Sequence, residues 1–146
     1  MTEAGGAAGL APAIELRQIG VAATGDAGEW EVRFLVANRG ANALQLISAR
    51  LPHGQFRSAE MQFDGLENLS PGETLTFAAR VHCQEPPGVV TENAFVIFLV
   101  GWRSVPWRIF VRLRVTGDGS GIPQAVTESI TTQKVGFSGV GETVRS

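Results

Sequence analysis

The residues with the most obvious catalytic chemistry in this sequence are its single cysteine and its two histidines. His82 and Cys83 are adjacent, and a thiol–imidazole pair could activate the sulfur as a nucleophile. Both residues belong to a run of alternating apolar and polar residues, and neighbouring side chains of a β-strand point to opposite faces. We therefore expect no catalytic pair here, and a buried structural thiol at Cys83. His53 lies in a Pro-His-Gly turn, where a solvated loop histidine is expected.

Motifs for metals and cofactors are missing as well. Zinc sites need three or four converging ligands, and neither a CxxC nor an HxxxH spacing occurs in the sequence. The glycine-rich segment 117–121 lacks both the repeated Asp or Asn ligands of a calcium loop and the Gly-Lys-Ser/Thr ending of a phosphate loop. We predict no catalytic residues, no metal site and no cofactor, and therefore a protein that is not an enzyme.

The most informative chemistry is an alternation of arginine with apolar residues near residue 110. A strand over 107–115, after a turn at Val105-Pro106, would direct Trp107, Ile109, Val111 and Leu113 into a core, and Arg108, Phe110, Arg112 and Arg114 outward. The preceding run, 94–102, is apolar at both parities, so one of its two sets must also face outward in a two-layer protein. Apolar groups flanked by arginines are typical of protein interfaces. The predicted partner-binding residues are Phe95, Ile97, Leu99, Arg103, Arg108, Phe110, Arg112 and Arg114.

This pattern favours a protein-interaction or scaffolding module that binds a partner protein or forms a homo-oligomer. The alternative is an accessory binding module for polysaccharide or nucleic acid, which exposed Trp102 or Trp107 would favour. Nucleic acid is the less favoured ligand, because the formal net charge is −2 and offers no overall attraction to phosphate. Another interpretation is that the segment 117–146 or the N-terminal lead folds over this face and covers it.

The elements that would position these residues are predicted to be strands throughout. From residue 13 to residue 116 the chain is a succession of runs of about ten residues, divided by Gly, Pro, Asn and Asp, as in sandwiches and barrels. Alternation is clearest over 30–36 and 75–83. A switch of parity between Leu46 and Ile47 indicates a bulge or a change of sheet. We predict an all-β, seven-stranded antiparallel sandwich, in which 94–102 is a central strand covered on both faces and 55–63 is an edge strand.

Two strings of residues also carry a resemblance to a known class of domain. Residues 34–40 read Phe-Leu-Val-Ala-Asn-Arg-Gly, and residues 69–77 read Leu-Ser-Pro-Gly-Glu-Thr-Leu-Thr-Phe. They resemble the V-x-N-x-G and L-x-P-G-E patterns of bacterial immunoglobulin-like and fibronectin-III-like domains. The resemblance implies an immunoglobulin-like sandwich, and it implies little about activity because the motifs are turn chemistry. The sequence departs from antibody-type domains, since it has one cysteine and no tyrosine.

The domain plan follows from where this pattern starts and stops. We predict a flexible N-terminal lead over 1–12, the sandwich over 13–116, and a flexible Gly-, Ser- and Thr-rich tail over 117–146, preferred to an extra strand near 126–132. The longest apolar stretch, 94–100, is far shorter than the ~20 residues of a spanning helix, so no membrane span is expected. A single cysteine and the lack of a secretory signal favour the cytoplasm. The excess of arginine over lysine suggests a GC-rich bacterial genome.

Overall fold

The computed structural model describes residues 10–52, 54–63, 67–84 and 86–135, and the regular elements in these ranges are all strands. They are β1 (Ile14–Ala23), β2 (Glu29–Asn38), β3 (Leu44–Leu51), β4 (Ser58–Gln62), β5 (Asn68–Leu69), β6 (Thr74–His82), β7 (Val90–Trp102), β8 (Val105–Gly117) and β9 (Pro123–Lys134). No helix in the described ranges is long and apolar enough to cross a membrane.

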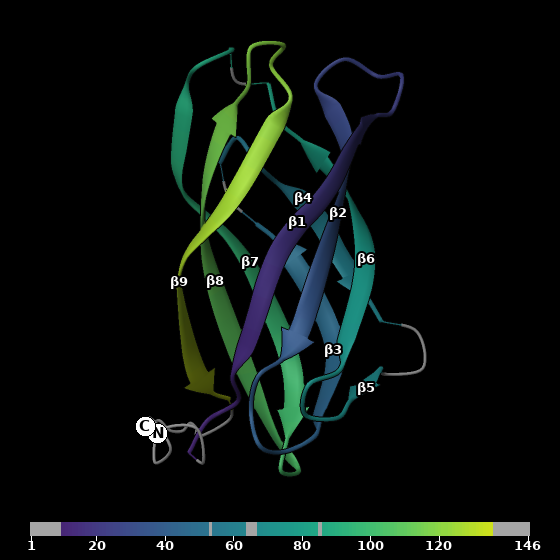
Figure 1. Ribbon diagram of the computed structural model, residues 1–146, viewed down its shortest axis with the longest axis vertical. Coiled ribbons are helices and arrows are strands. Elements are labelled where there is room, and N and C mark those ends of the chain that lie inside the picture. The colour runs from purple at the N-terminus through teal and green to yellow at the C-terminus, as the bar shows by residue number, and fades with distance from the viewer. Residues whose placement is uncertain (1–9, 53, 64–66, 85, 136–146) are drawn as a thin grey trace.

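The strands form two antiparallel sheets (Figure 1). Sheet A has the order β1-β2-β6, and sheet B has the order β4-β3-β7-β8-β9, with the short β5 paired to β3. The prediction of an all-β protein with two antiparallel sheets is confirmed. The edge position predicted for the run 55–63 is confirmed too, because β4 is one of the two edge strands of sheet B.

The core lies between the sheets and is filled by the inward side chains of each alternating strand. The largest fully buried side chains come from both sheets and include Phe34, Val32, Val36, Leu46, Phe98 and Ile109. Phe77 of β6 stands edge-on to Phe98 of β7, with ring centroids 5.9 Å apart, so an aromatic contact joins the two sheets. Because alternation along β2, β7 and β8 fixes which residues point inward, it also fixes which residues the sheets present to the outside.

The prediction of seven strands is wrong, because the described chain contains nine. One extra strand is the two-residue β5. The other is β9, which lies in the segment predicted to be a flexible linker and pairs with β8 from Trp107–Lys134 to Gly117–Pro123. Its sequence is rich in Thr, Ser and Gln because β9 is an edge strand with much of its surface exposed. Residues 1–9 and 136–146, the outer parts of the two predicted tails, lie outside the described residues.

The two strings that carry the domain resemblance meet in space around Asn38. The Asn38 side chain is 2% exposed and makes three hydrogen bonds. Its Nδ2 donates to the carbonyl oxygens of Asn42 and Leu69, both at 2.9 Å, and its Oδ1 accepts from the Gly40 N–H at 2.9 Å. The Gly72 N–H also donates to the Asn38 carbonyl at 2.8 Å. The buried side-chain amide of Asn38 therefore joins the β2–β3 turn to β5, and its backbone carbonyl joins it to the turn that follows β5.

The last long hairpin, β7–β8, occupies the centre of sheet B. Its turn has two residues, Arg103 and Ser104, both with positive φ (53° and 64°), as a tight hairpin turn requires. A bulge in β3 between Leu46 and Ser48 matches the predicted switch of parity and brings the strand into register with β7. The expectation that β7 is covered on both faces holds in part, because outward-facing Ile97 is buried while Phe95 and Leu99 remain partly exposed.

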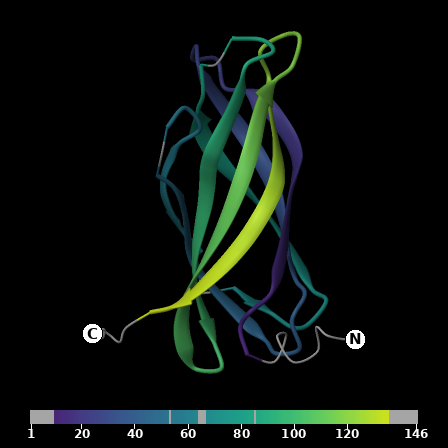
Figure 2. The ribbon, with the colours of Figure 1, turned by 90° about the vertical axis from the view of Figure 1, so that its left-hand side faces the viewer.

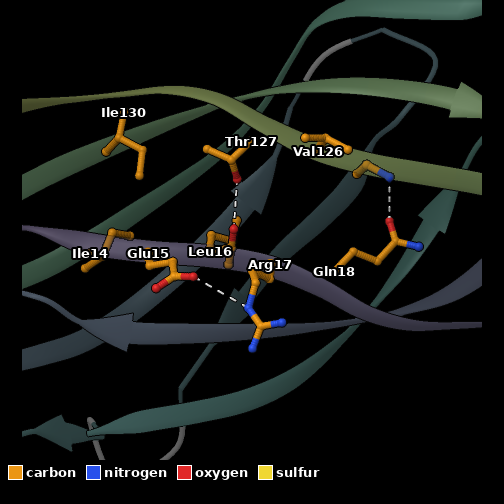
Figure 3. Close-up of a pocket in the computed structure, with 9 residues that line it drawn as sticks. Ile14, Glu15, Leu16, Arg17, Gln18, Val126, Thr127 and Ile130 are labelled. Carbon is orange, nitrogen blue, oxygen red and sulfur yellow. Dashed lines mark hydrogen bonds and ion pairs between the residues drawn. The ribbon is translucent and has the colours of Figure 1, made fainter. Parts of the chain in front are cut away.

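The free edges of the two sheets, β1 and β9, meet along one side of the sandwich (Figure 3). Side chains bridge them here. The Gln18 amide donates to the Pro123 carbonyl at 3.0 Å and accepts from the Ala125 N–H at 2.8 Å, as a peptide group in a ladder would. Thr127 Oγ1 donates to the Leu16 carbonyl at 2.9 Å. Side-chain amide and hydroxyl groups thus couple β9 to sheet A.

Removing the Gln18 amide should loosen this coupling. We expect Gln18→Ala to lower the free energy of unfolding by about 2 kcal/mol, because two hydrogen bonds of about 1 kcal/mol each are lost. Hydrogen exchange should quicken most at the Ala125 amide, which loses its acceptor. The control is Gln133→Ala, which removes the same side chain from an exposed position on β9. Equal effects of the two changes on stability and on the Ala125 amide would contradict this account of the seam.

Candidate functional site

The candidate site is the outer face of sheet B, the side turned away from the core. Side chains of β3, β7 and β8 form it. The cross-strand neighbours of β7 and β8 on this face are Phe95 and Arg112, Ile97 and Phe110, and Leu99 and Arg108. The register of β3 adds Ser48 beside Leu99 and Arg50 beside Ile97. Residues far apart in the sequence thereby form one continuous surface, which we call the outer face.

An apolar strip runs along the middle of the outer face. It consists of Phe95, Ile97 and Leu99, which follow one another at every second position of β7, and of Phe110 beside Ile97. Ile97 is only 7% exposed, and the other three side chains are partly buried. Arginines are the cross-strand neighbours of Phe95, Ile97 and Leu99, and the aliphatic stem of an arginine can cover apolar surface while its guanidinium stays in water. The strip therefore presents aromatic and aliphatic groups within a frame of positive charge.

Four arginines provide this frame, namely Arg50, Arg108, Arg112 and Arg114. Two glutamates oppose them. Glu128 Oε1 lies 3.9 Å from Arg112 Nε, and Glu60 lines a hollow of about 250 Å³ together with Arg50 and Arg108. The four arginines thus outnumber these two glutamates, although the whole chain carries a formal charge of −2. The local electrostatics of this face therefore favour an acidic partner.

Seven of the eight residues predicted to bind a partner lie together on the outer face. The exception is Arg103. It lies in the two-residue turn between β7 and β8 and therefore does not follow the inward–outward alternation of these strands. Its guanidinium carbon lies 5.5 Å from the centroid of the Trp102 ring, at the end of the sandwich. The prediction did not include Arg50, because β3 is brought beside β7 by a long-range pairing that the local pattern does not show. Arg50 stands between Ala49 and Leu51, which are both buried, and this alternation is the signal that would have predicted an outward side chain.

One alternative expectation is that the C-terminal segment folds over this face. The described part of that segment does not do so. Residues 123–134 extend sheet B as β9 beside β8. Figure 2 looks onto β7, β8 and β9, and no described segment passes in front of their ribbons. Residues 1–9 and 136–146 lie outside the described residues. Within the described ranges, the outer face is open to a partner.

The residues considered for catalysis are placed elsewhere. Cys83 is buried in the core, as predicted, and its carbonyl accepts a hydrogen bond of 3.1 Å from the Trp30 indole. His82 instead lines a hollow of about 560 Å³ between β4 and β6, with Arg57 and Arg80. The described residues contain no group of three or more His, Cys, Asp or Glu side chains able to hold a metal ion. His53 lies outside the described residues.

A second groove follows the seam between β1 and β9. It has a volume of about 470 Å³, and Ile14, Leu16 and Ile130 provide its apolar lining (Figure 3). Glu15 stands beside it, and a hydrogen bond from Arg39 Nε at 2.9 Å, together with the charge of Arg39, lowers the pKa of the Glu15 carboxyl. The hydrogen bonds of Gln18 and Thr127 cross this seam, so the groove belongs to the joint between the sheets.

Comparison of the sequence with protein-family models and with curated proteins finds no match.

Proposed function

We propose that this protein is a non-catalytic interaction module, and that the outer face of sheet B binds a protein with an acidic surface and exposed apolar groups. The observation that carries the proposal is the register of β3, β7 and β8, which joins four apolar side chains into a strip framed by four arginines. Aromatic residues and arginine are the side chains most enriched at the energetic centre of protein interfaces. Apolar groups would supply the affinity, and the arginines would orient an acidic partner.

Charge argues for a different protein rather than a second copy of this chain. A twofold-symmetric dimer would bring the same patch together twice. The four arginines of one outer face would then oppose the four of the other, and few carboxylates would be available to pair with them. An acidic partner meets no such cost. We therefore favour a complex with a different protein over a homo-oligomer formed through this face.

The alternative ligands, polysaccharide and nucleic acid, are less well supported. Both usually stack on exposed aromatic rings, and Trp102 and Trp107 are 4% and 8% exposed. The aromatic residues of the outer face, Phe95 and Phe110, are part of an apolar strip that would lie against a polar backbone of phosphates or sugars. A scaffolding role in the bacterial cytoplasm and membership of the immunoglobulin-like class are further parts of this proposal. The buried amide of Asn38, which joins the two resembling motifs, supports that class.

Site-specific photo-cross-linking tests the proposal. A benzophenone-bearing phenylalanine analogue is placed at Phe110, and a matched variant carries it at Leu35, a partly buried apolar residue on the outward side of sheet A. In the cells that make the protein, we expect a discrete cross-linked protein from position 110 and none from position 35. The purified captured protein should then rebind the unmodified chain, with an affinity that falls as salt rises.

Three results would overturn the proposal. The first is the same set of products from both positions, and the second is a product that disappears on nuclease treatment. The third is a homodimer as the main product at position 110, which light scattering would confirm as a doubled mass in solution. A captured protein that fails to rebind when purified counts against the proposal as well.

A further inference from the structure

A second site lies at the end of the sandwich to which both the β7–β8 turn and the end of β9 extend (Figure 1). A cavity of about 350 Å³ opens there, and its described lining consists of Leu10, Trp102, Arg103, Val105, Trp107 and Lys134. Ligand pockets of this size accept small organic molecules. None of these residues belongs to the outer face, so the cavity is independent of the proposed partner surface.

Two indole N–H groups in this lining have no acceptor among the described residues. Trp102 and Trp107 are perpendicular, with ring centroids 5.7 Å apart, and the Nε1 atoms of both are buried without a hydrogen-bond partner among the described residues. Trp30 behaves differently, because its Nε1 donates to the Cys83 carbonyl. In a perpendicular pair only one indole can direct its edge at the ring of the other, so at least one N–H lacks even that weak acceptor. Buried donors of this kind call for an acceptor from elsewhere.

Positive charge accompanies these donors. The Arg103 guanidinium carbon lies 5.5 Å from the Trp102 ring centroid, and Lys134 Nζ lies 5.6 Å from that of Trp107. The described lining contains no carboxylate. Arg103 is held there by a turn in which it has a left-handed backbone, a conformation that costs a residue with a side chain more than it costs glycine. Local conformation alone would therefore favour glycine at this position, whereas the sequence has arginine.

We propose that this cavity binds a carboxylate attached to an apolar group. The carboxylate would accept hydrogen bonds from the indole N–H groups and pair with Arg103 and Lys134, while Leu10, Val105 and the indole rings would contact the apolar part. Because the indole nitrogens are buried, side chains around them must shift when the ligand binds. Arg103 and Lys134, which lie over the two rings, are exposed and able to shift. Surface arginine and lysine side chains move on a fast timescale, so this step is no barrier to binding.

The test uses proton–nitrogen correlation spectra of the full chain, in which the three tryptophans give three indole signals. Phenylacetate is the probe, and phenylacetamide is its neutral counterpart. We expect phenylacetate to shift the Trp102 and Trp107 signals saturably, while the Trp30 signal stays in place because its N–H is already bonded. Phenylacetamide should bind at least ~10-fold more weakly, since charge-assisted hydrogen bonds are about twice as strong as neutral ones.

Variants separate this site from non-specific attraction. Lys134→Gln should weaken phenylacetate binding several-fold, whereas Arg114→Gln, on the outer face, should leave it unchanged. Equal binding of the acid and the amide, or no saturable shift at millimolar phenylacetate in any variant, would overturn the proposal.

Discussion

Replacing Asn38 with alanine is expected to lower the free energy of unfolding by about 3 kcal/mol, at about 1 kcal/mol for each of the three hydrogen bonds lost. The substitution removes the hydrogen-bond partner of the Gly40 N–H and of the carbonyl oxygens of Asn42 and Leu69. These bonds are buried, because Asn38 is 2% exposed. Chemical denaturation followed by tryptophan fluorescence measures the loss as a shift of the midpoint at an unchanged slope.

The matched control is Asn42→Ala in the same turn. The Asn42 side chain is exposed, and the group that Asn38 binds is the Asn42 backbone carbonyl, which alanine retains. Surface changes of this kind usually alter stability by no more than about 0.5 kcal/mol. If Asn38→Ala and Asn42→Ala had the same effect, the buried amide would not be the group that joins the β2–β3 turn to β5.

A glutamate at Phe110 is expected to weaken the complex with the partner protein at least ~30-fold, which corresponds to about 2 kcal/mol, the threshold of an energetic centre. Phe110 lies at the middle of the apolar strip beside Ile97, and a carboxylate there would oppose the acidic surface of the partner. Isothermal titration with the purified partner gives the affinity. The fold should persist, because the loss of one partly exposed cross-strand contact costs about 1 kcal/mol or less.

Leu35→Glu is the control for this change. It places the same charge at a partly buried apolar position in the middle strand of sheet A. We expect a similar small loss of stability and an unchanged affinity. A loss of affinity common to both variants would indicate a global effect of the added charge and would remove the case for the outer face.

The sequence predicted the inner and outer sides of the long strands because their alternation is regular. The hairpin from β7 to β8 pairs as expected, and its predicted outward residues Phe110 and Arg112 are outward. The same reasoning failed for β9, since an edge strand with much of its surface exposed needs few apolar residues and has the composition of a linker. The burial of Phe56, which is 0% exposed, was not predicted either, because a lone aromatic residue among polar turn residues gives no periodic signal.

The candidate site was predicted in part for a related reason. Local alternation identifies what β7 and β8 turn outward, but the third strand of the outer face arrives through the pairing of β3 with β7. Arg50 therefore joins the site through topology. Arg103 was assigned to the site by its nearness in sequence, and the left-handed turn carries it to the cavity at the end of the sandwich.

Hydroxyl-radical footprinting of the complex tests the central claim most directly, because it reports which side chains the partner covers. The side chains of Phe95, Leu99 and Phe110 should oxidise several-fold more slowly in the complex than in the free protein. Leu35 on sheet A should oxidise at the same rate in both. Unchanged oxidation at the three outer-face residues, together with protection of sheet A, would show that the partner binds elsewhere and would contradict the account.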